Sequence, residues 1–251
     1  MGFKIENDIL IEYTEEPGET DVVIPDGVTK IGDKAFSLDV FDNLKSVTIP
    51  DGVTIIGNEA FLLCENLISV TIPKSVKEIG ECAFMGCEKL TSVTIPNGVK
   101  FIGDHAFDGC NSLTKIVIPD SVTWIGEYCF TFCENLTSVT IPDGVHTIDE
   151  GAFEGCTSLK RVKIPESMSY IEENAFANCS SLKSVTIPNG GTMVEFGAFD
   201  NCNNLTIHAP KNSYAQEYAV ANNIAFKIYR ERINEHRQIN RKEDYYDIWL
   251  C

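Results

Sequence analysis

Residues 90–110 have the sequence LTSVTIPNGVKFIGDHAFDGC. In this stretch Val93 and Ile95 alternate with Ser92 and Thr94, a period of two that is typical of a half-buried strand. The proline that follows ends the strand, because proline has no N–H to donate to a continuing ladder. The stretch therefore predicts a short strand with one buried and one exposed side.

The second half of the stretch predicts a turn and a return to the core. Asn97 and Gly98 turn the chain, and a short helical turn is expected through Ala106 and Phe107, because Asp104 suits a helix N-terminus. The stretch thus predicts one strand, one turn and one segment that returns to the core.

The same pattern recurs along most of the sequence. An Ile-Pro pair repeats at a first interval of 25 residues and then at intervals of 23. A phenylalanine follows each proline by eleven residues, and from the second unit a cysteine follows by fourteen and a leucine by seventeen. The prolines are Pro25, Pro50, Pro73, Pro96, Pro119, Pro142, Pro165 and Pro188, and the cysteines are Cys64, Cys87, Cys110, Cys133, Cys156, Cys179 and Cys202.

Such a unit cannot bury its apolar side alone, but stacked units bury a continuous core. With neighbouring strands about 4.8 Å apart, about eight units would span roughly 40 Å. The repeat predicts a right-handed α/β solenoid with a parallel sheet and short helical turns.

The units resemble BspA-like, Treponema-type leucine-rich repeats. Residues 67–73 match L-x-x-V-x-I-P, and residues 79–87 match I-G-x-x-A-F-x-x-C. The resemblance covers about residues 21–208 and implies a leucine-rich-repeat horseshoe or rod whose parallel sheet is concave. It also implies an interaction protein of bacteria or protists, since some members are adhesins that contact host matrix proteins.

Four segments are expected. Residues 1–20 form an N-terminal β-hairpin cap, residues 21–208 the solenoid, residues 209–229 a helix-strand cap, and residues 230–251 a charged tail that is helical or disordered. Caps are expected because bare end coils would expose strand edges and apolar surface. Within the tail, Tyr245, Ile248 and Trp249 are spaced for one helical contact, and Cys251 is the cysteine most open to oxidation.

Charge and composition limit the partners. The formal net charge of −17 argues against non-specific binding to nucleic acid or to anionic membranes. No apolar run approaches the roughly 20 residues of a membrane span, and no signal peptide is written at the N-terminus. With its many thiols the chain is expected in the cytoplasm, whereas the family resemblance implies a secreted or cell-surface protein.

The cysteines and acidic residues are expected to have structural roles and not catalytic or metal-binding ones. The cysteine column predicts buried core thiols, since its spacing suits neither disulfides nor a zinc site, and Cys82 and Cys129 fall outside it. An acidic column is expected to cap the helical turns, with a cation site as the alternative. No nucleophile, phosphate-binding or zinc-protease motif is found, so neither an enzyme nor a cofactor is predicted. The acidic column contains Asp33, Glu81, Asp104, Glu127, Glu150 and Glu173.

The exposed side of the strands carries a first set of candidate binding residues. Most outward positions hold serine or threonine, and basic residues depart from this pattern. They are either a recognition patch for an acidic partner or glycan, or a solvated surface paired with acidic residues of neighbouring coils; the paired alternative is favoured. The candidates are Lys115, Lys160, Arg161, Lys163 and Lys183.

A second set stands five residues after the proline. Lys30, Glu78 and Thr147 at equivalent positions show that this site tolerates solvent, so large apolar residues there are either interface candidates or partly buried against adjacent coils. These residues are Ile55, Phe101, Trp124, Tyr170 and Met193, and the candidates for binding are Phe101, Trp124 and Tyr170.

The sequence therefore predicts a non-catalytic protein-binding scaffold of the adhesin or ligand-binding type. A carbohydrate or cell-wall binding module that uses the aromatic residues is the first alternative. An assembly module joined through the C-terminal tail is the second.

Overall fold

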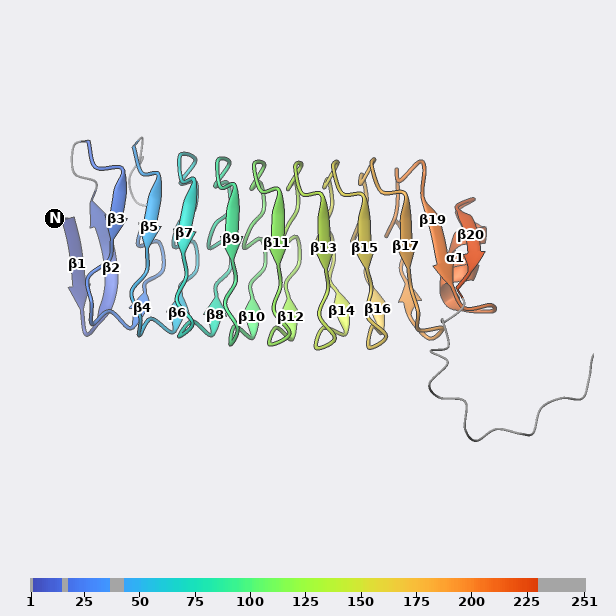
Figure 1. Ribbon diagram of the computed structural model, residues 1–251, viewed down its shortest axis with the longest axis horizontal. Coiled ribbons are helices and arrows are strands. Elements are labelled where there is room, and N and C mark those ends of the chain that lie inside the picture. Colours follow the sequence, from blue (N-terminus) through green and yellow to red (C-terminus); the bar gives the residue numbers. More distant parts are fainter. Residues whose placement is uncertain (1, 15–17, 37–42, 230–251) are drawn as a thin grey trace, which may run out of the picture.

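The computed structural model describes residues 2–14, 18–36 and 43–229, which form an elongated stack of coils with little bend (Figure 1). Each coil has a three-residue strand, a turn after the proline, a two-residue strand and a series of turns that leads to the next coil. In the coil of the opening stretch these strands are β9 (Ser92–Thr94) and β10 (Phe101–Ile102). The alternation of apolar and hydroxyl residues thus produces the predicted strand.

The strands repeat once per coil. The strands on one side are β3 (Asp21–Val23), β5 (Ser46–Thr48), β7 (Ser69–Thr71), β9, β11 (Lys115–Val117), β13 (Ser138–Thr140), β15 (Arg161–Lys163), β17 (Ser184–Thr186), β19 (Thr206–Ala209) and β20 (Ala225–Ile228). The two-residue strands are β4 (Lys30–Ile31), β6 (Ile55–Ile56), β8 (Glu78–Ile79), β10, β12 (Trp124–Ile125), β14 (Thr147–Ile148), β16 (Tyr170–Ile171) and β18 (Met193–Val194).

Consecutive coils pair in parallel and in register. Val70 lies beside Val47 and Val93, so equivalent residues form columns along the stack. The strand orders are β11-β9-β7-β5-β3 and β13-β15-β17-β19-β20 on one side, and β1-β2-β4-β6-β8-β10-β12 and β14-β16-β18 on the other. Both sides are interrupted between the same two coils, those of β11–β12 and β13–β14. We call this interruption the seam.

The core is made of the repeated apolar residues. The repeat phenylalanines are buried and stack face to face, with ring centroids 4.6 Å apart for Phe36 and Phe61 and 5.4 Å apart for Phe107 and Phe130. Tyr13 continues the stack beyond Phe36 at one end. The solenoid is therefore built on one uninterrupted aromatic column that also crosses the seam.

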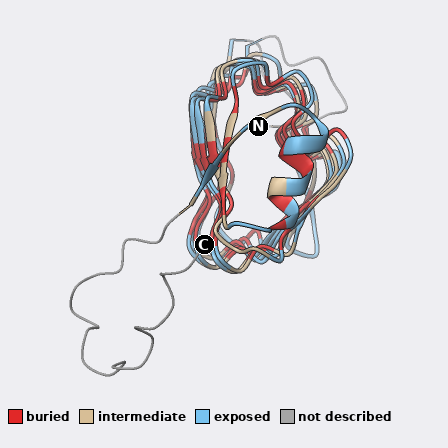
Figure 2. Ribbon diagram, turned by 90° about the vertical axis from the view of Figure 1, so that its right-hand side faces the viewer, coloured by how far each residue is buried: buried red, intermediate tan, exposed pale blue. Residues whose placement is uncertain are grey.

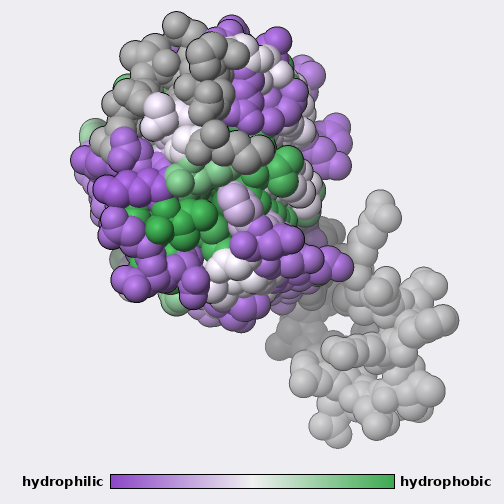
Figure 3. All heavy atoms as spheres, turned by 90° about the vertical axis from the view of Figure 1, so that its left-hand side faces the viewer, coloured by the Kyte–Doolittle hydropathy of each residue, from purple (hydrophilic) through white to green (hydrophobic). Residues whose placement is uncertain are grey.

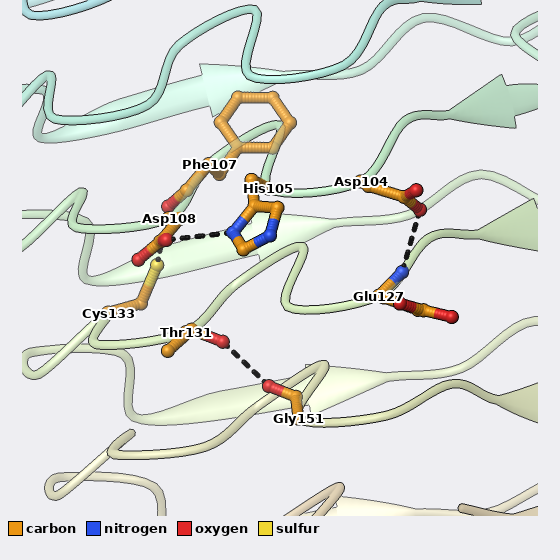
Figure 4. Close-up of polar contacts among 8 residues, drawn as sticks. All are labelled: Asp104, His105, Phe107, Asp108, Glu127, Thr131, Cys133 and Gly151. Carbon is orange, nitrogen blue, oxygen red and sulfur yellow. Dashed lines mark hydrogen bonds and ion pairs between the residues drawn. The ribbon is translucent and has the colours of Figure 1, made fainter.

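The predicted short helical turns are absent from the described coils. The residue nine positions after each Ile-Pro proline has a positive φ, for example 54° at His105 and 53° at Cys82, and a right-handed helix excludes this conformation. The acidic column therefore does not cap helices. Instead, Oδ1 of Asp104 accepts a hydrogen bond from the backbone N–H of Glu127 in the next coil, at 2.9 Å, as shown in Figure 4.

Glycine explains how closely the first coils approach one another. A Cβ on Gly103 would lie 2.6 Å from the backbone N of Glu81, and one on Gly126 would lie 2.5 Å from the backbone N of Asp104. Real Cβ atoms do not approach so closely, so a side chain cannot fit here without displacement. Asp149 is the first residue with a side chain at this position after five coils with glycine, and its coil begins the second half of the stack. The seam thus coincides with the change from glycine to aspartate at this position.

Both described ends are closed. The antiparallel hairpin of β1 (Gly2–Glu6) and β2 (Ile9–Thr14) turns at Asn7 and Asp8, and β2 pairs in parallel with β4. Apolar surface remains at this end (Figure 3), where Ile5 is 40% exposed. At the other end, α1 (Tyr214–Ala221) lies across one side of the last coil (Figure 2), with Ser213 as its N-cap.

The remaining part of the chain is not described. The tail of residues 230–251, with the predicted contact of Tyr245, Ile248 and Trp249 and with Cys251, lies outside the described residues. Among the residues that are described, no helix has the length and apolar character needed to span a bilayer.

Candidate interaction surfaces

The first candidate surface is the outward side of the three-residue strands, which we call the strand face. The central residue of each strand is buried, and the residues before and after it point outward, as in β9 and β13. The N-terminal half of the face is mainly serine and threonine. At its edge, hydrogen bonds from Ser46 and Thr20 lower the pKa of Asp21.

Four of the five basic candidates gather on the C-terminal half of this face, and Lys115 of β11 lies just before the seam. Arg161 and Lys163 are both exposed and flank the buried Val162 of β15. Lys160 and Lys183 are exposed at the edge, where the chain enters successive strands, and the backbone N–H of Lys183 donates to the carbonyl of Lys160 at 3.4 Å. We call Lys115, Lys160, Arg161, Lys163 and Lys183 the basic patch.

The favoured pairing of these residues with neighbouring acids is not found. Within the described residues, ion pairs are formed by Lys4, Lys30, Lys34 and His105, and by none of the basic patch. The reason lies in the register, because the outward neighbours of Arg161 are Ser138 and Ser184 and contain no carboxylate. The basic side chains are thus available to a partner.

Two further basic residues extend the patch and were missed in the sequence. Lys163 lies beside Thr186, Thr186 beside His208, and His208 beside Lys227 of β20. A count of 23 residues from Thr186 leads to Ala209 instead, which is buried. The last coil is one residue shorter before its strand, so the repeat length alone would place Ala209, and not His208, on the strand face.

The second candidate surface is the outward side of the two-residue strands. Phe101 and Trp124 lie side by side in register and are 49% and 40% exposed, and Tyr170 and Met193 form a similar pair at 42% and 39%. Each of these side chains is therefore partly covered and partly open to solvent, so both alternatives hold in part. We call Phe101, Trp124, Tyr170 and Met193 the aromatic row.

Carboxylates accompany the C-terminal part of this row. Nε1 of Trp124 donates to Oδ2 of Asp149 at 2.8 Å across the seam. Partial burial raises the pKa of Asp149 to about 6, the Trp124 hydrogen bond opposes the rise, and the nearby carboxylates of Glu127 and Glu172 add to it. Burial likewise raises the pKa of Glu172, with Glu195 contributing. This part of the surface combines exposed rings with crowded negative charge.

The fold can now be compared with known proteins. The family model for the BspA type leucine rich repeat region matches residues 15–123 and 100–227, with six copies of the repeat. The chain belongs to this family. Repeats of this class are generally non-catalytic binding scaffolds, and they indicate a protein-interaction scaffold here.

Two solved leucine-rich repeat proteins are similar to the chain in fold. A leucine-rich repeat protein of Treponema pallidum is 28% identical, with a TM-score of 0.63 over 90% of this chain and 94% of that one. A leucine-rich repeat protein of Bacteroides ovatus is 27% identical, with a TM-score of 0.61 over 90% of this chain and 74% of that one. Among curated proteins, none matches the chain.

The cysteine column of the BspA-type repeats is structural. All nine cysteines of the described residues are free, and the seven of the column are buried. Each column thiol donates to a phenylalanine carbonyl of the preceding coil, for example from Sγ of Cys110 to the carbonyl of Phe84 at 3.3 Å. Burial raises the pKa of the Cys110 thiol well above its usual value. Within the described ranges, no three His, Cys, Asp or Glu side chains are grouped to hold a metal ion.

Proposed function

We propose that this BspA-type protein is a non-catalytic scaffold that binds an acidic segment of a protein partner on the C-terminal half of its strand face. The observation that carries the proposal is the basic patch, whose side chains are exposed and without a carboxylate partner among the described residues. On a chain with a net charge of −17, a surface of the opposite sign selects partners by charge complementarity.

The composition of the surface supports this choice of partner. From β11 to β20 the outward positions of the strand face hold hydroxyl, apolar and basic side chains and no acid. His208 and Lys227 continue the basic character to the C-terminal cap. An extended acidic segment lying across the coils would meet basic groups over several neighbouring strands, on a backbone that needs no rearrangement.

The test is the affinity for an acidic peptide, measured by calorimetry with an oligoglutamate probe. The double variant R161S/K163T introduces the residues that occupy these positions in neighbouring coils, so the strands keep their packing. We expect it to weaken binding about tenfold or more, because it removes two direct charge contacts. The affinity of the wild-type protein should also fall as salt is added.

A matched control separates the patch from net charge. The variant K77T/K100T removes the same charge in the turn that precedes the two-residue strands, where other coils already have threonine, as at Thr54 and Thr123. It should change affinity less than about twofold, since these residues lie off the strand face. Equal losses for both variants would contradict the proposal. An adhesin role, and a cytoplasmic or cell-surface location, stay predictions.

A further inference from the structure

A second surface of opposite charge lies on the two-residue strands. In each coil the second residue of the two-residue strand is an isoleucine or valine, six positions after the proline. The residues five and seven positions after the proline flank it. At the C-terminal end of the stack these flanking positions hold both large apolar and acidic side chains. We call this set the aromatic–acidic strip, and it consists of Trp124, Asp149, Tyr170, Glu172, Met193 and Glu195.

The register brings the strip together. Thr147, Tyr170 and Met193 are direct neighbours on β14, β16 and β18, so the residues two positions later are also stacked coil upon coil. The backbone N–H of Glu172 donates to the carbonyl of Ile148 at 2.9 Å, and that of Glu195 to Ile171 at 2.9 Å. The three carboxylates therefore follow one another at the coil spacing, beside three exposed apolar side chains.

Within the part of the chain that the structure describes, no basic side chain pairs with the carboxylates of the strip. None of the ion pairs within the described residues includes Asp149, Glu172 or Glu195. The residues that directly precede Thr147, Tyr170 and Met193 are His146, Ser169 and Thr192, so this position supplies no lysine or arginine beside the strip. Burial is the main cause of the raised pKa of Asp149 and the nearby carboxylates add to it, so a cation placed among these carboxylates would relieve their contribution.

From this geometry we propose that the aromatic–acidic strip binds an extended segment of a partner protein that is rich in lysine or arginine. A cation over the face of an exposed ring gains a cation–π interaction, and the adjacent carboxylate adds a direct charge contact. A peptide in the polyproline II conformation has three residues per turn and rises about 3.1 Å per residue, so every third side chain lies on the same side and spans roughly 9 Å, close to the distance of two coils. A basic residue at every third position would thus meet Trp124 and Tyr170, which are two coils apart.

The carboxylates favour a cationic peptide over a sugar. A neutral carbohydrate would stack on the rings but would leave the crowded carboxylates without a counter-charge. The strip is also independent of the proposed function, because it lies on other strands and has the opposite charge to the basic patch.

The experiment measures binding of a peptide with lysine at every third position by calorimetry, beside the same peptide with glutamine in place of lysine. We expect the lysine peptide to bind and the glutamine peptide to bind at least about tenfold more weakly. The variant D149N/E172Q should weaken binding of the lysine peptide about tenfold, because it removes two charges from the strip while keeping the size of both side chains. The variant W124T/Y170T, which introduces the residue found at Thr147, should do the same through loss of the rings.

Two controls carry the same changes elsewhere. D26N/D51N removes two charges from exposed turns near the N-terminus, and F132G removes an exposed ring from another column, where Gly109 and Gly155 stand in neighbouring coils. Both should bind the lysine peptide within about twofold of the wild type, provided that thermal melting shows them folded. Equal loss in D26N/D51N and D149N/E172Q would mean non-specific attraction to an acidic protein and would overturn the proposal.

The remaining outcomes also decide the matter. Binding of a neutral oligosaccharide that depends on Trp124, with no binding of the lysine peptide, would assign the strip to carbohydrate and would overturn the proposal. R161S/K163T should leave binding of the lysine peptide intact, so loss of oligoglutamate binding in that variant and loss of lysine-peptide binding in D149N/E172Q test the two surfaces separately.

Discussion

The indole Nε1 of Trp124 donates a 2.8 Å hydrogen bond to Oδ2 of Asp149 across the seam, where the parallel ladders on both sides of the solenoid are interrupted. Other side-chain contacts cross the same gap. The hydroxyl of Tyr128 donates to Oε1 of Glu150. Figure 4 shows the second contact, in which Oγ1 of Thr131 donates to the carbonyl of Gly151 at 2.7 Å. Side chains thus join the two halves of the stack where the strands do not pair, together with backbone hydrogen bonds such as that from the N–H of Phe130 to the carbonyl of Ala152 at 2.8 Å.

Replacing Asp149 by asparagine should stabilise the protein at neutral pH. The pKa of Asp149 is raised from 3.8 to about 6, so the folded protein binds this proton more tightly than the unfolded chain does. Stability from this group is therefore complete below the unfolded pKa and is lost as the pH rises through about 6. The D149N variant has no such loss and keeps an oxygen that can accept from Trp124.

We expect D149N to be more stable than the wild type by about 1 kcal/mol near pH 7.5, with the difference vanishing below about pH 4. Urea unfolding across this pH range measures it. The D51N variant removes the same charge from an exposed turn and serves as the control. If D51N stabilises as much as D149N, general charge repulsion and not the position of Asp149 is responsible.

The coils could be predicted from the sequence because the same apolar positions recur in every repeat, and these side chains are buried only when the repeats stack. Two features were not predictable in this way. Left-handed turns at residues such as His105 and Tyr128 depend on hydrogen bonds between coils, for instance from the backbone N–H of His105 to the carbonyl of Glu127. In the sequence, an acidic residue before such a turn looks like the N-cap of a helix. In the structure its carboxylate accepts a hydrogen bond from the backbone of the next coil instead.

The candidate surfaces were predicted as columns and corrected by register. Arg161 and Lys163 were assigned to the strand face because the 23-residue interval holds there, and the structure places them on it. His208 was overlooked because one residue is missing before β19, which shifts the column. Likewise, the contact between Trp124 and Asp149 joins residues 25 apart, and only the stacking of the coils brings them together.

Truncation of Phe107 should strongly destabilise the solenoid. Its ring is fully buried between Phe84 and Phe130, with centroid distances of 5.2 and 5.4 Å. The F107A variant leaves a cavity in the aromatic column and should cost about 3–5 kcal/mol of unfolding free energy, whereas F107L should cost less. Urea denaturation followed by circular dichroism measures both.

The control for this cost is an exposed ring. Phe101 is 49% exposed, so F101A should change the unfolding free energy by no more than about 0.5–1 kcal/mol. Similar losses for F101A and F107A would show that the buried stack is not the main source of stability.

Cys82 should react slowly although it is only partly buried. Burial, together with the carboxylates of Glu81 and Glu59, raises the pKa of its thiol from 9.0 to about 11. Near pH 8 the thiolate is then about a hundredfold scarcer than at an ordinary cysteine, and alkylation slows in proportion. The rate should rise with pH up to about 11, and E81Q should increase it at neutral pH. Peptide mapping after timed iodoacetamide labelling measures it, with the urea-unfolded chain as the reference for full reactivity.

A further prediction concerns the contact between Phe132 and Gly155. Both residues have a positive φ, 54° and 69°, and they occupy the same position in neighbouring coils. A Cβ on Gly155 would lie 2.5 Å from Cδ1 of the Phe132 ring, which covers this glycine. The G155A variant should therefore lose about 1–3 kcal/mol, from the left-handed backbone and from displacement of the ring.

The two causes can be separated with a second substitution. F132G places a glycine where Gly109 has one in the preceding coil, and it removes both the ring and the left-handed strain at residue 132. Because half of the Phe132 side chain is exposed, little apolar burial is lost, and the single variant should be about as stable as the wild type. In the F132G background G155A should cost about 1 kcal/mol, the backbone part alone. An undiminished cost in that background would show that the Phe132 ring does not constrain residue 155.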